Sequence, residues 1–597
     1  MNGAVPDGLL TLGVVCLGLL VTAGAVAATW LASPEERRRH QRALAGPLLT
    51  AVAAVGSVVV AGAPSALVAA AMATAATGVL LWWQRPAARV RRLYGHGGWM
   101  GVRSYIEAAT KRATRAVNPP APRVDGTAAR PVNRHGAMLG RLVTGPLLIR
   151  GLRVLSAWTR GILMLGPPGS GKTSMLVGLV LDAPGAAYVS STKTELFDLT
   201  ADFRAQHGAV RVFNPTGLGG RRSTFAWNPL SGCTDGAVAD KRARALVRGG
   251  GGAAGSGSKE FWADKASEIV RCYLLAAALS GRTMESVQAW AQNAQDTTPV
   301  ELLEQHEAAV PKGWLDSLRR HLDAAPNERS GYFAAVLPAV SFLDNAAVAA
   351  ACNPQGDDET DLAEFVAGTD TLYVIAGEGD RRIAPLITAL TEAVFETAKI
   401  VAATRGGRLS PPLAMFLDEV ANTTPVPLDH WAADSRGWGI SIVAVLQDLA
   451  QLNSRWGDDA AATIFNNLPT KVVLPGVASK EDLERLAYLA GPRWDRRNSE
   501  GRDKTWETSE VVSGGNLYKL PRWHAFVAGV GPQAAIVRFV PGYLQVRRAR
   551  RKLGRTVEAS PSRRPEMTLT PTRDPISTHE ELAPGHEPIR TRAGAMS

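Results

Sequence analysis

The chain has 597 residues, enough for two to four domains, and a formal net charge of +12. The charge is unevenly placed: residues 84–153 carry 14 Lys and Arg against two acids, whereas residues 154–544 are net negative. This excludes a uniformly basic nucleic-acid-binding protein. The four cysteines lie far apart with no C-x-x-C pair, so they support neither a disulfide framework nor a zinc site, and they fit a reducing compartment.

The first 83 residues are predicted to be a transmembrane region. Residues 9–31 hold no charge over 23 positions, which is long enough to span a bilayer. No basic segment precedes them, as one would in a signal peptide. Residues 47–83 are a second uncharged stretch, interrupted by Gly-Ala-Pro-Ser at 62–65. This stretch is predicted to form one span with an apolar lead-in or a tight hairpin, so the sequence allows two spans, the count that we favour, or three.

Basic residues after this region predict its orientation. Arg85, Arg89, Arg91 and Arg92 follow the last apolar stretch, which places the bulk of the chain on the cytoplasmic side of the membrane. Residues 84–150 are rich in Pro and Arg and are predicted to be a basic juxtamembrane linker. Anionic lipid heads are the favoured contact of this linker, and nucleic acid is the alternative.

A phosphate-binding loop is predicted where an apolar strand, residues 161–165, is followed by a helix that begins near Ser174. The residues between them fill the pattern G-x-x-x-x-G-K-[ST] without a mismatch: Gly166, Pro167, Pro168, Gly169, Ser170, Gly171, Lys172 and Thr173. In this setting backbone N–H groups and the helix N-terminus, Ser174 included, hold phosphates. Lys172 is expected to reach the β- and γ-phosphates and Thr173 to ligand the metal. ATP and Mg²⁺ are therefore the predicted cofactors.

Alternating strand and helix patterns after residue 150 predict an α/β fold with a mainly parallel sheet and crossover helices. The predicted nucleotide-binding domain comprises residues 151–234 and 366–544. Residues 235–365 interrupt it with helical spacing alone and are predicted to be an all-α insertion, with a flexible Gly-rich loop at 249–258. Residues 545–597 are polar and Pro-rich and are predicted to be a disordered tail.

A second motif lies about 245 residues after the P-loop. The apolar strand 413–417 ends in Asp418 and Glu419. In P-loop ATPases the first acid holds the Mg²⁺ shell and the second polarises the attacking water. Such strand ends are common by themselves, and the P-loop is what makes the assignment. A later strand, 441–445, leads to Gln447, whose amide is expected to sense or position the γ-phosphate or its water.

The motifs at and after Asp418 resemble those of the TraG/TraD/VirD4 group of type IV secretion coupling proteins, the membrane ATPases of bacterial conjugation. The resemblance covers roughly residues 150–540. Its strongest stretches stand at the family's spacings: Phe416-Leu417-Asp418-Glu419-Val420-Ala421-Asn422, Ser435-Arg436-Gly437-Trp438-Gly439, Leu446-Gln447, Trp456-Gly457 and Thr470-Lys471-Val472. Many members carry D-P-K-G-E where this chain has Ser191 followed by Thr-Lys-Thr-Glu, and the missing acid puts a polar role at that position in doubt.

The resemblance implies a RecA-like motor that assembles as a homo-hexameric ring. The chain would be a multi-pass protein of the bacterial inner membrane, with its bulk in the cytoplasm. Such motors receive single-stranded DNA bound to a relaxase within the relaxosome and feed it to the type IV secretion channel. The resemblance also makes Arg436, which two glycines favour placing on a loop, a candidate arginine finger supplied by the neighbouring subunit.

Two other functions remain open on the sequence. A coupling ATPase of the same kind can export protein effectors in place of DNA. A nucleotide-switched membrane receptor would dock its cargo without processive pumping. The complete set of residues expected for hydrolysis argues against an inactive ATPase; it comprises Lys172, Thr173, Asp418, Glu419 and Gln447.

Overall fold

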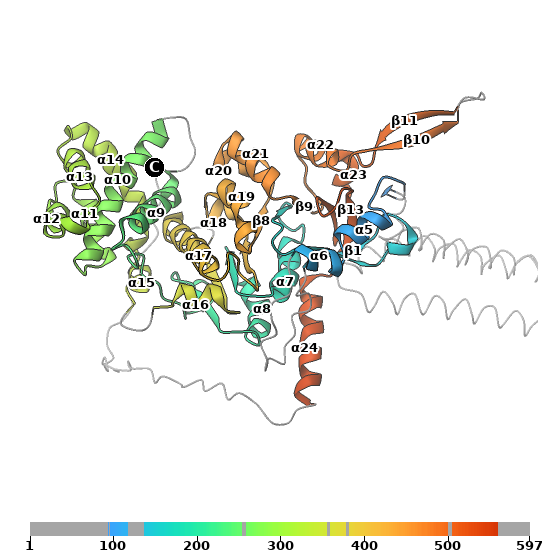
Figure 1. Ribbon diagram of the computed structural model, residues 1–597, viewed down its shortest axis with the longest axis horizontal. Coiled ribbons are helices and arrows are strands. Elements are labelled where there is room, and N and C mark those ends of the chain that lie inside the picture. The colour runs from blue at the N-terminus through green and yellow to red at the C-terminus, as the bar shows by residue number, and fades with distance from the viewer. Residues whose placement is uncertain are drawn as a thin grey trace, which may run out of the picture. The chain divides into compact units, whose positions relative to one another are not determined.

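The computed structural model describes residues 93–94, 96–117, 136–252, 258–354, 359–377, 381–498 and 504–558 (Figure 1). The predicted transmembrane region, residues 1–83, and the tail beyond residue 558 lie outside these ranges. Within them no helix is both long and apolar enough to cross a bilayer. The described residues up to Arg547 belong to one compact unit.

An 11-stranded sheet organises this unit. Its strands are β1 (Ala137–Leu142), β2 (Arg153–Ser156), β3 (Ile162–Leu165), β4 (Ala187–Ser191), β5 (Val210–Phe213), β6 (Thr371–Ile375), β7 (Leu413–Leu417), β8 (Ile440–Leu446), β9 (Thr470–Val473), β12 (His524–Ala528) and β13 (Ala535–Arg538). They lie in the order β2-β1-β13-β12-β9-β3-β8-β7-β4-β6-β5. The strands from β9 to β5 are parallel, and those from β12 to β2 continue the sheet antiparallel.

The strand order brings the predicted motifs to one edge of the sheet. β8 pairs with β3 on one side and with β7 on the other, so that Leu446 lies opposite Leu165 and Ala444 opposite Leu417. All three strands are buried at every residue, as expected for parallel strands covered on both faces. Their carboxyl ends, which lead into the P-loop, Asp418 and Gln447, therefore lie side by side.

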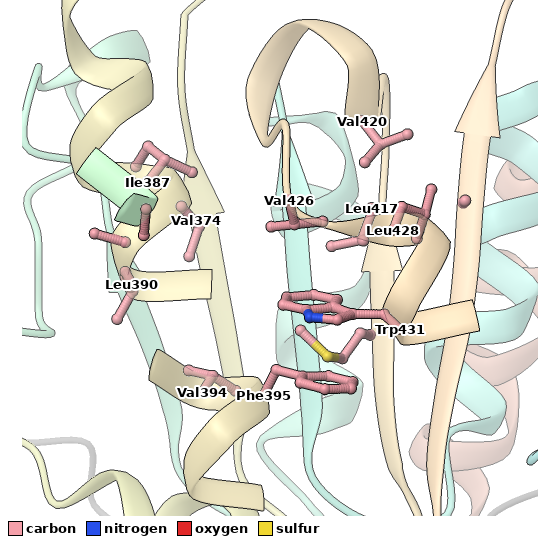
Figure 2. Packing of buried hydrophobic residues seen from close by; sticks show 14 of the residues in the cluster. Val374, Ile387, Leu390, Val394, Phe395, Leu417, Val420, Val426, Leu428 and Trp431 are labelled. Carbon is pink, nitrogen blue, oxygen red and sulfur yellow. The ribbon is translucent and has the colours of Figure 1, made fainter. Parts of the chain in front are cut away.

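Helices connect the parallel strands and cover the sheet. They are α7 (Lys172–Asp182), α8 (Glu195–Arg204), α17 (Ala384–Thr404), α18 (Val420–Thr423), α19 (Leu428–Trp438), α20 (Ala450–Trp456), α21 (Asp458–Asn467), α22 (Lys480–Tyr488) and α23 (Gly514–Tyr518). Figure 2 shows the core where α17 meets α19: the rings of Phe395 and Trp431 stack with centroids 4.0 Å apart and planes 5° from parallel. Val374 of β6 and Leu417 of β7 belong to the same buried cluster.

Between β5 and β6 the described residues form helices and no strand (Figure 1). The α-helices are α9 (Gly236–Val247), α10 (Ser258–Leu279), α11 (Met284–Gln292), α12 (Thr298–Gln305), α13 (Trp314–Leu322), α14 (Pro326–Val340), α15 (Ala346–Ala351) and α16 (Leu362–Ala367). Helix α10 packs against α9 and against α11 to α14. Its residues from Ile269 to Ala277 are almost wholly apolar and, apart from Arg271, buried, as the central helix of a helical bundle requires.

The Gly-rich stretch of this insertion is packed where the sequence predicts a flexible loop. Residues 248–252 form a π-helical turn, η3 (Arg248–Gly252). A Cβ atom at Gly249 would lie 2.5 Å from Pro385, and one at Gly250 would lie 2.9 Å from Pro338. The loop prediction is wrong here because these glycines permit close approach of two backbones. Residues 253–257 lie outside the described ranges.

Two predicted boundaries are also wrong. The segment predicted as a linker, residues 84–150, contains α5 (Val102–Ala108), α6 (Lys111–Val117), η1 (Leu147–Ile149) and β1, so the sheet begins before residue 151. A bulge near Gly140 breaks the alternation that would have marked β1.

At the other end α24 (Gly542–Glu558) is helical where disorder was predicted from residue 545. Its many Arg residues make the segment polar, yet Arg is a good helix former. β10 (Pro492–Asn498) and β11 (Lys504–Glu510) form a separate two-stranded sheet (Figure 1).

Candidate functional site

A cleft of about 1140 Å³ opens at the carboxyl edge of β3, β8 and β7. It is lined by the P-loop, by Asp418 and Glu419, and by Gln447. The structure thus brings together motifs that stand up to 281 residues apart in the sequence (Gly166 to Gln447). Ligands of open α/β sheets bind at this edge, because the loops that follow the parallel strands converge there.

The P-loop leaves backbone donors exposed to the cleft. Gly169 and Gly171 adopt left-handed backbone with φ of +77° and +105°, which glycine tolerates best. Gly171 is the N-cap of α7 and no side chain caps the helix, so its first N–H groups face the cleft as anion donors. The loop packs closely against itself at Gly166, because a Cβ at this position would lie 2.5 Å from the Ser170 hydroxyl oxygen.

The Lys172 side chain contacts the first residue of its own P-loop. Its Nζ donates a hydrogen bond of 2.7 Å to the Gly166 carbonyl oxygen, and the residue is only 8% exposed. Burial lowers the pKa of Lys172, while the nearby Glu419 and Asp418 carboxylates oppose that shift. The two acids therefore favour the cationic form that a phosphate partner requires.

Asp418 is buried at the end of β7 beside Ser191, the last residue of β4. The Ser191 hydroxyl donates to Asp418 Oδ2 at 3.1 Å. Burial raises the pKa of Asp418 to about 6, and the Ser191 hydrogen bond and the Lys172 charge oppose the rise. Ser191, the departure from the family pattern, therefore has a polar role that the sequence left in doubt: it stabilises the charged form of Asp418.

Glu419 adopts an unusual backbone conformation. Its φ is +51° and ψ +46°, a left-handed geometry that costs a non-glycine residue on the order of 1–3 kcal/mol. The turn is held by the N–H groups of Asn422 and Thr423, which donate to the Glu419 carbonyl oxygen at 2.8 and 3.1 Å. Strain of this kind persists where the surrounding structure fixes the position of a functional side chain.

Gln447 follows β8 and lies between the P-loop and the two acids. Its N–H donates to Gln451 Oε1 at 2.9 Å, which fixes the backbone at the strand end, and both residues line the cleft. Because β8 separates β3 from β7, a side chain at its end can reach a group held by either neighbour. That this amide positions the γ-phosphate or its water stays a prediction from the sequence.

The residues fit a magnesium ion shared with a nucleotide. Among the described residues no group of three or more His, Cys, Asp and Glu side chains could hold a metal ion. Mg²⁺ commonly takes one or two protein oxygens and completes its shell with phosphates and waters. Thr173 and Asp418 both line the cleft and would supply those two oxygens.

Arg436 lies away from this cleft. The sequence favoured a loop, but Arg436 stands in the last turn of α19 and is exposed. The helix ends at Gly439, whose left-handed φ of +75° closes it, and Trp438 Nε1 donates to Asp434 Oδ1 at 2.8 Å one turn earlier. Because β8 starts at Ile440, Arg436 is at the amino edge of the sheet, opposite the P-loop.

Several residues of the cleft were not assigned from the sequence. Lys193, Arg522 and Trp523 line it, together with Gly249 to Gly251 of the insertion. Lys193 is the lysine of the Thr-Lys-Thr-Glu run that follows Ser191, where the family pattern D-P-K-G-E also has a lysine. The others carry no local motif, because the loop before β12 and the turn η3 reach the P-loop only through the tertiary fold.

The fold and the site define an α/β protein with a P-loop at the carboxyl edge of a mainly parallel sheet. Residues 412–519 match the family model described as "TraM recognition site of TraD and TraG". This match covers about a fifth of the chain and supports the resemblance to TraG/TraD-type coupling proteins that its sequence motifs indicate.

Solved structures share the fold. The unbound monoclinic form of bacterial conjugative coupling protein TrwBdeltaN70 is 19% identical, with 65% of this chain and 87% of that chain covered and a TM-score of 0.52. The trigonal form of the same protein, in complex with sulphate, is 18% identical, with 64% and 86% covered and a TM-score of 0.50. No curated protein matches the sequence.

Proposed function

We propose that this protein is a membrane-anchored ATPase that couples a relaxosome to a type IV secretion channel and drives single-stranded DNA through it during conjugation. The observation that carries the proposal is the convergence of Lys172, Asp418, Glu419 and Gln447 on one cleft of a TraG/TraD-type chain. A cargo receptor without turnover would need the phosphate-binding residues alone.

Each residue has a distinct task in hydrolysis. The α7 N-terminus and Lys172 would hold the triphosphate, and Thr173 and Asp418 would hold Mg²⁺, which would neutralise charge on the phosphate oxygens. Glu419 takes the proton of the attacking water, and Gln447 orients that water or the γ-phosphate. Arg436 of a neighbouring subunit completes the charge stabilisation in a closed homo-hexameric ring.

Partners follow from the family and from the sequence. Residues 412–519 would dock a relaxosome protein of the TraM kind, as the name of the matching family model suggests. Residues 1–83 would anchor the ring in the bacterial inner membrane, with the bulk of the chain in the cytoplasm and the basic segment 84–153 against anionic lipid. A coupling ATPase for protein effectors would have the same site. The two functions therefore differ only in the cargo, DNA or protein.

The test is the ATPase rate of the full-length chain, measured alone, with single-stranded DNA and with duplex DNA, beside Lys172→Ala as the inactive control. Stimulation by single-stranded DNA above duplex supports the DNA motor. Turnover that DNA does not change would move the proposal to the protein-exporting alternative. Nucleotide binding without any turnover would favour the receptor.

A further inference from the structure

Trp523 is the one aromatic side chain among the described residues that line the nucleotide cleft. It stands in the turn before β12, where the His524 N–H donates to the Pro521 carbonyl oxygen at 3.1 Å. The guanidinium carbon of Arg522 lies 4.7 Å from the centre of the indole ring, and Arg522 lines the cleft as well. A flat apolar surface and a cation thus face a cleft lined mainly by polar, charged or small residues.

The backbone of Trp523 is strained. Its φ is +64°, a conformation that a bulky residue rarely adopts and that usually requires glycine or asparagine in such a turn. Among the described residues only Glu419 and Trp523 are non-glycine residues with positive φ, and both line this cleft. A strain of about 1–3 kcal/mol that is retained beside a site suggests that the side chain is needed there.

The surrounding residues place the indole directly over the P-loop. A Cβ built on Gly171 would lie 3.3 Å from the benzo edge of Trp523, so the ring covers the last P-loop residue before α7. Phe539 packs edge-on against the ring, with centroids 5.8 Å apart, and the Phe539 N–H donates to the Trp523 carbonyl oxygen at 3.0 Å. These contacts hold the indole beside the position where a phosphate chain meets the P-loop.

We propose that Trp523, with Arg522 beside it, binds the base of the nucleotide whose phosphates the P-loop holds. This inference rests on the proposed nucleotide binding and adds the site of base recognition. The ring stacks on the base, and the guanidinium adds a cation over the paired π-systems. Stacking uses the face that every base presents and does not read its hydrogen-bonding edge. Adenine and guanine nucleotides therefore bind with affinities within a few-fold of each other.

The experiment separates base from phosphate recognition. Isothermal titration calorimetry on the full-length chain compares Mg²⁺ complexes of AMP-PNP, GMP-PNP and inorganic tripolyphosphate. We expect Trp523→Leu to weaken AMP-PNP and GMP-PNP by about 10- to 100-fold, the range of base–aromatic stacking, and to leave tripolyphosphate within about twofold. Trp494→Leu, an exposed tryptophan of β10, is the matched control and should change none of the three.

Other outcomes are equally informative. Equal weakening of AMP-PNP and tripolyphosphate by Trp523→Leu would overturn the inference, because it would mean that the indole only shapes the loop at Gly171. Unchanged AMP-PNP affinity would overturn it as well. If Trp523→Leu does not fold, Trp523→Phe carries the test, with a selective loss for AMP-PNP of about two- to fivefold expected for a smaller ring. A wild-type chain that binds none of the three ligands would instead overturn the proposed function.

Discussion

The two edges of the central sheet carry opposite kinds of chemistry. At the carboxyl edge Asp418 and Lys172 are 7% and 8% exposed, and each has a hydrogen-bond partner and an opposite charge nearby. At the amino edge Arg436 is exposed and stands near two further arginines, Arg160 and Arg408, whose pKa values are lowered by burial and by the charge of Arg436. Among the described residues no carboxylate pairs with the Arg436 guanidinium.

The difference indicates how copies of the chain would work together. Strand β8 separates Arg436 from Gln447 by seven residues of extended chain, about 23 Å at ~3.3 Å per residue, so Arg436 cannot serve the P-loop of its own chain. A ring formed by head-to-tail contacts joins unlike surfaces of neighbouring copies. Such a contact can bring the basic amino edge of one copy to the phosphate site of the next.

The largest expected effect is at the carboxyl edge. Lys172→Ala should abolish hydrolysis, because the γ-phosphate loses its cationic partner at the P-loop. Lys193 lines the same cleft and makes Lys193→Ala the matched control, with a partial loss expected. The rate of phosphate release measures both. If Lys172→Ala retains some turnover, and this turnover disappears when Lys193→Ala is added, Lys172 does not have a unique role.

Glu419→Gln should bind Mg²⁺-ATP yet hydrolyse it about 10²- to 10⁴-fold more slowly, since an amide cannot accept the proton of water. Asp418→Asn should instead raise the Mg²⁺ concentration needed for half-maximal rate, because it removes a charged ligand. Magnesium titrations at saturating ATP distinguish the two. Identical titration curves for both variants would show that the two acids do not divide the work in this way.

Part of this site could be predicted from the sequence because its motifs are contiguous. The P-loop, Asp418 and Gln447 each follow an apolar strand, and parallel strands bring their ends together. Trp523 follows the P-loop by some 350 positions and reaches it only through the antiparallel part of the sheet. Arg436 was placed on a loop because two glycines flank Trp438, whereas the helix tolerates Gly437 and ends at Gly439.

Packing also explains why the loop predicted at the Gly-rich stretch is wrong. A run of glycines is typical of flexible loops, but Gly249 and Gly250 stand where a side chain would collide with Pro385 or Pro338. The sequence shows the glycines but does not show that these prolines lie beside them in the folded chain. The helical content of residues 236–367 was predictable because apolar residues recur there at the spacing of an amphipathic helix.

The free energy of unfolding tests whether burial of the charged Asp418 carboxylate destabilises the fold. The pKa of Asp418, about 6, is above the ordinary 3.8, so the folded state binds the proton of this carboxyl more tightly than the unfolded state does. The stability that this proton binding contributes is fully present below pH 3.8 and is lost as the pH rises through 6. Asp418→Asn should therefore stabilise the chain at pH 8 by roughly 2–3 kcal/mol and have little effect near pH 4. Urea unfolding without nucleotide at both values measures it. A destabilised variant at pH 8 would contradict the assigned burial cost.

Ser191→Ala should have the smallest effect. Loss of the hydroxyl that donates to Asp418 Oδ2 raises the pKa of that carboxyl further, since this bond is stronger to the carboxylate than to the neutral acid by about 1 kcal/mol, or somewhat less than one pH unit. The acid limb of the pH profile of kcat/KM should shift to higher pH by that amount, and the rate at pH 8 should be almost unchanged. A profile that does not move would mean that Ser191 leaves the charge of Asp418 unaffected.

The most direct test of the account mixes two inactive variants. Arg436→Ala should retain ATP binding and lose hydrolysis, with a typical effect of about 10³- to 10⁵-fold, and Lys172→Ala should be inactive for its own reason. In a randomly mixed ring about one quarter of the head-to-tail interfaces join an intact P-loop to an intact Arg436, so the mixture should regain up to that share of the wild-type rate. With subunit exchange verified by labelled protein, a mixture no more active than either variant alone would contradict the joint use of the two edges.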